Sequence, residues 1–275
     1  MYGRQKSEMR PVPAHTPMNL FSDVLESLRR GDLILSLAYL KIAARTRNAA
    51  LGVFWNVVGF AFFVFGIAIL WTVVFDLNKA TFLPYVALGY FTFQMANLMM
   101  LDAARSISDG GNFALQNRIP LTLLPLVSVT KHCVIALFAL PTVLLALALY
   151  PETLSPRALL AIPGLLVCIL TFAGISISLS IVCVYVADLA ELLSSVMRFM
   201  FFLTPVIWIA EERSALRPVL LANPLHHAIN IVRGPVLGSA EVSLSFAIMA
   251  VWLVASWLIA AILYARLARG VMLRI

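Results

Sequence analysis

The sequence predicts an all-α integral membrane protein with six transmembrane helices, an N-terminal cytoplasmic amphipathic helix and short re-entrant helices before the last span. Of its 275 residues, 62% are apolar and only 12% are charged, whereas a soluble domain is about half apolar and about a quarter charged. Long uncharged runs separate the charged residues, and a helix needs about 20 apolar residues to cross a bilayer. The net charge of +7 comes from basic residues at the ends of these runs, as in membrane proteins. We therefore expect membrane lipids, and no nucleic acid, as partners.

The uncharged runs place the six spans at about residues 57–75, 82–101, 121–150, 158–184, 192–210 and 242–265. Two spans contain a cation, because Lys131 falls in the third and Arg198 in the fifth. We expect the flexible stem of Lys131 to carry its ammonium group to the lipid headgroups. Arg198 lies about 10 Å into the membrane by helical rise. It either reaches the headgroups in the same way or lines a passage through the protein.

The distribution of basic residues predicts that both termini lie in the cytoplasm. Thirteen of the 20 Lys and Arg residues fall in the segments 1–56, 102–120, 185–191 and 266–275. Five fall in the segments 76–81, 151–157 and 211–241. Basic residues are enriched on the cytoplasmic side of membrane proteins, so the first group is assigned to that side.

Residues 1–36 are predicted to be a cytoplasmic arm, and residues 37–275 the transmembrane domain. The first 20 residues have the composition of a disordered segment, and residues 21–35 are predicted to form a short helix. Residues 37–55 are predicted to be an amphipathic helix at the cytoplasmic interface, with Trp55 at the lipid boundary. Its polar face carries Lys41, Arg45 and Asn48, and its apolar face carries Leu37, Leu40, Ala44 and Leu51. This helix is either a surface anchor or an element that transmits movement.

Two connections on the cytoplasmic side have distinctive sequences. Residues 102–120 are long enough for a separate short helix, with a joint at Gly110 and Gly111 and an end at Pro120. Residues 185–191 are tight and acidic, and Asp188 either caps the next helix or has a functional role.

The stretch from residue 196 to residue 238 suggests a gate. A membrane helix tolerates the Pro that follows Thr204, because its neighbours can satisfy the freed backbone groups. A short charged patch comes next. Residues 223–238 are amphipathic, with Pro near both ends, and are too short and polar to span a bilayer. A full span followed by a partial one is typical of a passage that can be closed.

No catalytic or metal-binding pattern is present in the sequence. There is no GxxxxGK[ST] phosphate loop, no GxSxG and no HExxH, so the chain is not expected to bind ATP itself. His226 and His227 are adjacent and therefore point in different directions on a helix. The three cysteines lie singly in apolar runs and are expected to pack as small apolar residues.

Four sequence features together resemble a known family. They are Arg45, Thr46 and Arg47 followed by Leu51, Gly52 and Trp55; Asp188 and Leu189; Phe201 and Phe202 before Thr204, Pro205, Val206, Ile207 and Trp208; and Asn223, Pro224 and Leu225. From about residue 37 to its end, the chain resembles the permease subunits of type-2 ABC exporters. The similarity is to the branch that exports O-antigen, capsule or teichoic acid polysaccharides. The chain departs from this pattern at Ala187, where the family often has Arg, at Arg198, where an uncharged polar residue is commoner, and in its longer N-terminal arm.

The resemblance implies a homodimeric channel in the bacterial cytoplasmic (inner) membrane that exports a polyprenyl-pyrophosphate-linked polysaccharide, such as the O-antigen of lipopolysaccharide. It implies two copies of a separate ATP-binding subunit that bind ATP and magnesium, so this chain needs no cofactor and is not an enzyme. It also implies that residues 37–55 and 103–118 contact the ATPase, that the first and fifth spans line the conduit, and that residues 218–233 close its outer mouth.

These expectations single out three groups of residues. Aromatic rings suit a sliding polymer, because stacking with sugars does not demand one register, although such rings often only pack in membrane helices. The channel-lining candidates are Phe60, Phe63, Arg198, Phe199, Phe202 and Trp208. The ATPase-coupling candidates are Lys41, Arg45, Arg47, Arg105, Asp109 and Asp188. The outer-gate candidates are Asn223, Pro224, His227 and Arg233, of which Arg233 could bind headgroups or an anionic substrate.

Two other functions remain open from the sequence. One is an ABC exporter permease for a small hydrophobic drug or a lipid, against which the aromatic first and fifth spans argue weakly. The other is a membrane enzyme acting on polyprenyl lipids. Such an enzyme needs polar groups clustered at one membrane face, and its best candidates are scattered: Asp102, Arg105, Asp109 and Arg118.

Overall fold

The computed structural model of the chain describes residues 19–46, 52, 54–209, 215–239, 241–271 and 273–274, without the side chains of Arg45 and Thr46. Every regular element in these residues is helical, which confirms the predicted all-α class. The elements are α1 (Leu20–Arg29), α2 (Gly31–Thr46), α3 (Phe54–Val74), α4 (Lys79–Gln116), α5 (Leu123–Ala148), η1 (Pro151–Thr153), η2 (Ala158–Leu160), α6 (Ala161–Tyr185), α7 (Asp188–Leu203), α8 (Arg217–Ala222), α9 (Pro224–Leu237) and α10 (Val242–Val271).

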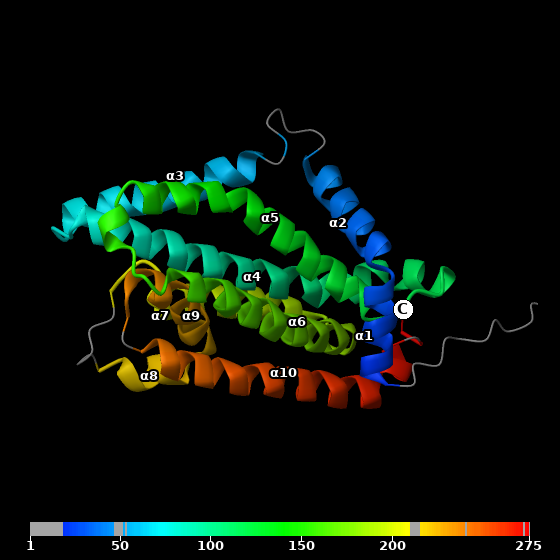
Figure 1. Cartoon of the computed structure of the whole chain (residues 1–275). Coiled ribbons are helices and arrows are strands. Elements are labelled where there is room, and N and C mark those ends of the chain that lie inside the picture. Colours follow the sequence, from blue (N-terminus) through cyan, green and yellow to red (C-terminus); the bar gives the residue numbers. More distant parts are fainter. Residues whose placement is uncertain are drawn as a thin grey trace, which may run out of the picture.

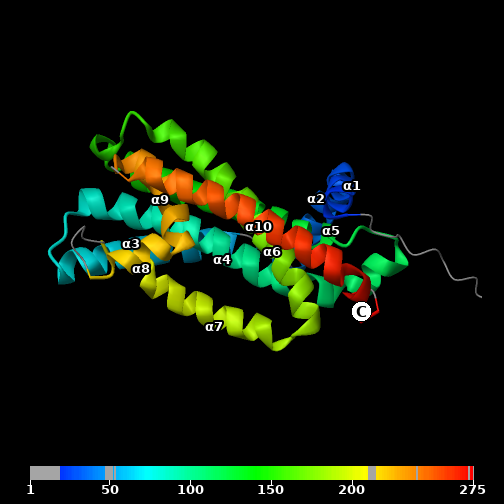
Figure 2. The ribbon, with the colours of Figure 1, turned by 90° about the horizontal axis from the view of Figure 1, so that it is seen from below.

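The long helices α3, α4, α5, α6 and α10 run along one axis of the molecule (Figure 1), and α7 lies beside α4 (Figure 2). The core is richest around α6, which packs against α4, α9 and α10. Two glycines of α6 allow this close packing. A Cβ atom on Gly164 would lie 2.3 Å from the carbonyl oxygen of Ile231 in α9, and one on Gly174 would lie 2.7 Å from Oγ of Ser256 in α10. Small residues let the backbones of membrane helices approach in this way.

The connections gather at the two ends of the bundle. The helices α1 and α2, the end of α4 and the C-terminal end of the chain lie at one end, called here the inner end (Figure 1). The turns η1 and η2, the helix α8 and the start of α10 lie at the opposite, outer end. A hydrogen bond of 2.7 Å from the backbone N–H of Ser155 to the carbonyl of Val236 joins the η1–η2 connection to α9.

Among the described residues, four helices are long and apolar enough to cross a membrane: Phe54–Val74, Leu123–Ala148, Ala158–Tyr185 and Val242–Val271. The other two predicted spans, 82–101 and 192–210, fall on α4 and α7. The predicted span in α4 contains the amides of Gln94 and Asn97, and α7 has only 16 residues, with charges at Asp188, Glu191 and Arg198.

The predicted separate helix in residues 102–120 is wrong, because α4 continues without a break from Lys79 to Gln116. At 1.5 Å per residue, these 38 residues span about 57 Å, so α4 extends well beyond a hydrocarbon core of about 30 Å. Gly110 is not a joint. A Cβ atom there would lie 3.0 Å from Cδ2 of Leu124, so the missing side chain makes room for the start of α5.

The predicted helix at residues 37–55 is also wrong in its bounds. The helix α2 begins at Gly31, runs across the predicted boundary after residue 36, and ends at Thr46, while Trp55 belongs to α3. Between them, Gly52 has a φ of 53°, in the left-handed region that favours glycine. The side of α2 that faces the protein carries Ile34, Ala38 and Ile42, and α2 packs on α5.

The fifth predicted span is too long, because α7 ends at Leu203. Thr204 is extended, with a ψ of 136°, since a residue before Pro is disfavoured in helical conformation. Two short helices, α8 and α9, then precede α10, where the sequence predicts short helices. Pro235 lies inside α9 rather than at its end. The helix ends at Leu237 and is followed by Gly238, which adopts a left-handed conformation.

Candidate functional site

An aromatic cluster joins α3, α4 and α7. The ring of Phe63 stacks on Tyr90 with centroids 4.0 Å apart, and Phe60 stacks on the same ring at 5.2 Å. Phe201 of α7 meets both Phe63, at 5.9 Å, and Phe93, at 5.3 Å. The structure therefore brings Phe60 and Phe63 together with aromatic residues of α4 that the sequence analysis did not single out. A signal was available, since Tyr90 and Phe93 share their span with two side-chain amides.

A cavity of about 300 Å³ lies beside this cluster. Its wall combines aromatic rings with polar side chains. Its lining includes Phe63, Tyr90, Phe202, Gln94, Asn97 and Arg198. Oδ1 of Asn97 is buried and has no hydrogen-bond partner in the described part of the chain. Arg198 is exposed and donates to the hydroxyl of Ser195 at 3.1 Å.

Two further cavities continue along α4. One, of about 320 Å³, includes Phe60 and shares Tyr90 and Gln94 with the first cavity. The other, of about 300 Å³, reaches the inner end and shares His132 with the second cavity and Ser194 with the first. The shared residues place these cavities side by side, and together they are called the α4 groove.

Three of the channel-lining candidates lie differently from Phe60 and Phe63. The side chain of Phe202 is 66% exposed and lines the α4 groove. Phe199 is 63% exposed and lines none of the three cavities. Trp208 lies outside them as well, and its indole N–H donates to the carbonyl of Phe202 at 2.9 Å.

The inner end of the α4 groove is charged. Nζ of Lys131 lies 2.6 Å from Oδ1 of Asp102, and Nε2 of His132 lies 3.7 Å from the other carboxylate oxygen. The expectation that Lys131 reaches the lipid headgroups is therefore wrong, because its ammonium group is buried and paired inside the protein. Arg105 forms an ion pair with Glu191, which links α4 to the first turn of α7.

The other coupling candidates are more dispersed. Asp109 is exposed and lines the same end of the groove. Asp188 is the exposed first residue of α7, whose N-cap is Ala187, so it does not cap the helix. Lys41 is exposed on α2, and no hydrogen bond or ion pair among the described residues joins it to this group. Arg47 and the side chain of Arg45 lie outside the described residues.

At the outer end, α4 and α9 hold the chain where it leaves α7. The side-chain amide of Asn223 donates to the hydroxyl of Thr204 at 2.8 Å. The side-chain oxygen of Asn223 accepts from the backbone N–H of Leu225, so Asn223 caps α9, which begins at Pro224. Nη1 of Arg233 donates to the carbonyl of Pro205 at 2.8 Å. The Tyr85 hydroxyl lies 3.2 Å from that carbonyl and 3.0 Å from the carbonyl of Trp208. Residues 204–208 and these three side chains are called the outer junction.

His227, the remaining outer-gate candidate, fastens three helices. Its Nδ1 lies 3.0 Å from the hydroxyl of Ser245 in α10, and its Nε2 lies 2.9 Å from the carbonyl of Leu221 in α8. The ring is buried, so its role in this structure is to connect α8, α9 and α10.

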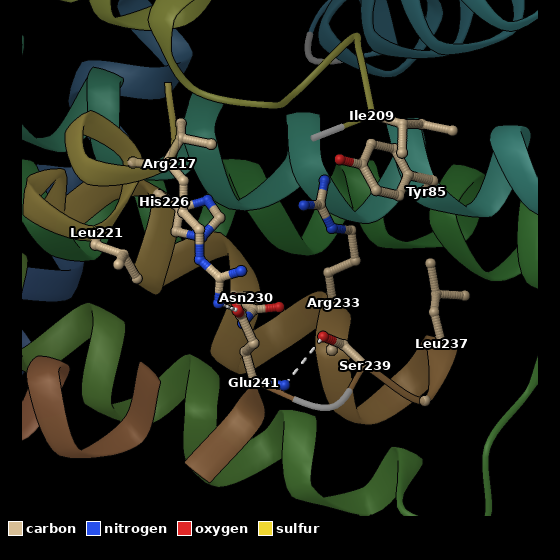
Figure 3. A pocket seen from close by; sticks show the side chains of 13 residues that line it. Tyr85, Ile209, Arg217, Leu221, His226, Asn230, Arg233, Leu237, Ser239 and Glu241 are labelled. Carbon is tan, nitrogen blue, oxygen red and sulfur yellow. Dashed lines mark hydrogen bonds and ion pairs between the residues drawn. The ribbon is translucent and has the colours of Figure 1, made fainter. Parts of the chain in front are cut away.

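A pocket of about 270 Å³, called here the outer pocket, adjoins the outer junction (Figure 3). His226, Asn230 and Arg233 of α9 line it, and Arg217 pairs with Glu241 at 3.0 Å on its edge. Burial, together with the charges of His227 and Arg233, lowers the pKa of His226 to about 4. His226 is not a candidate from the sequence, because only the tertiary structure shows that it lines a cavity.

The described residues contain no group of three or more His, Cys, Asp and Glu side chains that could hold a metal ion. The three cysteines Cys133, Cys168 and Cys183 are free thiols.

No protein-family model matches this chain. Among curated proteins, it is similar to the O-antigen export system permease protein RfbA of Myxococcus xanthus. The two are 27% identical over 198 residues, which cover 70% of this chain and 75% of the relative. This similarity confirms the resemblance to the permease subunits of type-2 ABC exporters. Together with the four long apolar helices, it indicates a multi-pass membrane protein that acts as a transport subunit.

Proposed function

We propose that this chain is the channel-forming permease of an ATP-driven exporter. Its substrate is a polyprenyl-pyrophosphate-linked polysaccharide of the O-antigen type, which it moves across the bacterial cytoplasmic membrane. The similarity to an O-antigen export permease supports this proposal. The observation that carries it is the α4 groove, whose lining combines aromatic rings with side-chain amides.

The lining of the α4 groove suits a sugar chain. A sugar ring presents C–H groups on its faces and hydroxyls on its edges. The rings of Phe63 and Tyr90 offer apolar surfaces to the faces, and the amides of Gln94 and Asn97 offer donors and acceptors to the hydroxyls. The buried Oδ1 of Asn97 lacks a partner that a sugar hydroxyl would supply. A polyprenyl tail needs no such groups and stays in the lipid.

In this proposal, α4 and α7 supply the second and fifth spans, so that the chain crosses the membrane six times with both termini in the cytoplasm. The amides of α4 are tolerated because they line a cavity inside the protein rather than face lipid. The short helices α8 and α9 enter the membrane from the outer side and close the outer mouth.

A second copy of this chain completes the conduit. The side chains of Phe62 on α3 and of Phe199 and Phe202 on α7 are 81%, 63% and 66% exposed. These helices flank the α4 groove, so pairing two copies across them would enclose the grooves between the protomers. Two ATP-binding subunits, which carry the ATP and magnesium, dock at the inner end on α2 and on the part of α4 beyond the membrane.

Export of a fluorescently labelled lipid-linked glycan from membrane vesicles tests the proposal. The chain is co-expressed and co-purified with candidate ATP-binding subunits from the same genome. Phe63→Ala is expected to lower export several-fold without lowering ATP hydrolysis, because it removes a wall of the groove. Phe138→Ala is the matched control, since Phe138 is partly exposed on α5 and lines none of the groove cavities. Export by the isolated chain without any ATP-binding subunit would contradict the proposal.

A further inference from the structure

The outer pocket lies between α4, α8, α9 and the start of α10. Its wall on α9 is a stripe of His226, Asn230, Arg233 and Leu237. The spacing of four, three and four residues puts these side chains on one face of the helix. The pocket of about 270 Å³ is slightly smaller than typical ligand sites, which measure about 300–1,000 Å³. It can therefore hold one small polar group rather than several sugars.

Arg233 is a buried cation, and no acidic side chain in the described part of the chain pairs with it. The residue is 6% exposed and forms no ion pair in the described part of the chain. Its guanidinium carbon lies 3.6 Å from the centre of the Tyr85 ring, and Figure 3 shows the group turned toward that ring. Of its five N–H donors, one is used by the carbonyl of Pro205, and the guanidinium also interacts with the Tyr85 side chain. Since buried charges are normally paired, a cation lining a cavity in this way favours an anion in that cavity.

His226 is a second unsatisfied group on the same face. The residue is 8% exposed, and its Nδ1 is buried without a hydrogen-bond partner. The low pKa of His226 keeps the ring neutral near pH 7, so it can donate one hydrogen bond without adding charge.

The charged side chains at the edge of the pocket do not neutralise the positive charge of Arg233. Glu241 is the acidic residue among the lining side chains, and it already pairs with Arg217 at 3.0 Å. Among the described lining residues there are two guanidinium groups and one carboxylate, so these side chains together carry a net positive charge.

We propose that the outer pocket binds a phosphate-type oxyanion, with the Arg233 guanidinium as its charged anchor and Nδ1 of His226 as a neutral donor. A guanidinium presents paired donors that match the oxygens of a phosphate. Such an anion has two sources here, the headgroup of a bilayer phospholipid or the pyrophosphate of the exported lipid, and the second source rests on the proposed function. Because Arg233 also holds Pro205, the bound anion and the position of the outer junction are coupled.

Binding is measured on the purified full-length chain with two probes. Inorganic pyrophosphate is titrated by calorimetry, and retention of phosphatidylglycerol against phosphatidylcholine is measured by native mass spectrometry. We expect saturable pyrophosphate binding or selective phosphatidylglycerol retention. If phosphatidylglycerol is retained selectively and pyrophosphate displaces it, the anion comes from a phospholipid headgroup. If pyrophosphate binds and phosphatidylglycerol is not retained selectively, the anion is the pyrophosphate group of the exported lipid.

Three variants test the assignment of the site. Arg233→Gln is expected to weaken binding at least about tenfold, the usual effect of losing a charge-assisted contact of about 1.4 kcal/mol or more, and Arg233→Lys to restore part of it. Asn230→Asp keeps Arg233 and places a carboxylate on the pocket wall, so it is expected to block binding even if Arg233→Gln fails to fold. Lys79→Gln, which removes an exposed cation at the start of α4, is the control.

The proposal is overturned if neither probe binds the wild-type chain, or if folded Arg233→Gln and Asn230→Asp bind as the wild type does. Neither measurement involves ATP or transport. A failed export assay would therefore leave this result unchanged.

Discussion

Asn223 donates its side-chain amide to the hydroxyl of Thr204 at 2.8 Å, and both residues are buried. Each precedes a proline, and each is extended, with ψ angles of 112° and 136°. The two breaks in the helical chain, after α7 and before α9, are therefore fastened to each other. This contact gives the two motifs of the resemblance, around Thr204 and around Asn223, one shared structural role.

Asn223→Ala is expected to destabilise the protein. It removes a helix cap, which costs about 1 kcal/mol, and it leaves the buried Thr204 hydroxyl without its donor, which costs about 1–3 kcal/mol. Thermal unfolding in detergent measures the loss. The control is Asn78→Ala, which removes the exposed cap of α4 and should cost only about 1 kcal/mol. Equal losses in the two variants would argue against a contribution from Thr204.

The ion pair of Lys131 and Asp102 is expected to contribute to stability, because removing one partner leaves the other charge unpaired in the protein. Lys131→Met leaves the Asp102 carboxylate, whose side chain is 30% exposed, without its ammonium group. We expect a loss of about 3 kcal/mol, the lower end of the range for breaking a buried pair. The double variant Lys131→Met with Asp102→Asn should recover much of this stability. A double-mutant cycle by thermal unfolding measures the coupling, and additive losses would contradict it.

The ion pair of Arg105 and Glu191 should affect movement more than stability. Both side chains are largely exposed, at 54% and 74%, so Arg105→Gln should change the free energy of unfolding by less than about 1 kcal/mol. We expect it to lower export while ATP hydrolysis by the partner continues, because the pair links α4 to α7. Exchanging the charges, Arg105→Glu with Glu191→Arg, should restore export. If the exchange restores nothing, the pair does not transmit movement.

Arg198→Gln tests whether the charge in the α4 groove takes part in transport. The exposed guanidinium donates a hydrogen bond to the Ser195 hydroxyl in the preceding turn of the same helix, so stability should change little. Export should fall several-fold if the guanidinium contacts the passing substrate. Ser195→Ala removes that contact, keeps the charge, and should export normally. Unchanged export by Arg198→Gln, at normal expression, would remove this residue from the mechanism.

His226 should make stability depend on pH. Its pKa is lowered from 6.5 to about 4 in the folded protein, so the unfolded chain binds the proton at higher pH. The stabilisation is complete above pH 6.5 and is lost as the pH falls toward 4, up to about 3 kcal/mol at one pKa unit per 1.36 kcal/mol. The unfolding midpoint of His226→Gln, measured from pH 7.5 to pH 4.5, should be less dependent on pH than that of the wild type. Parallel curves would contradict the assignment.

The sequence by itself determined the helical class and the position of most long helices. Uncharged runs of about 20 residues bounded by charges have few other stable arrangements, so α3, α5, α6 and α10 lie close to the predicted spans. Pro224 also marked a real break, because proline acts on the backbone locally. The break at Thr204, before Pro205, falls inside the predicted fifth span and was not expected.

Tertiary structure alone decided which distant side chains meet. Gly110 permits either a joint or close packing, and the neighbouring Leu124 selects packing. The partner of Lys131 is Asp102 on another helix, and the burial of Arg233 depends on Tyr85 and Pro205 from two other parts of the chain. Periodicity reports which face of a helix is apolar, but pairing and cavities depend on how separate helices are placed in space.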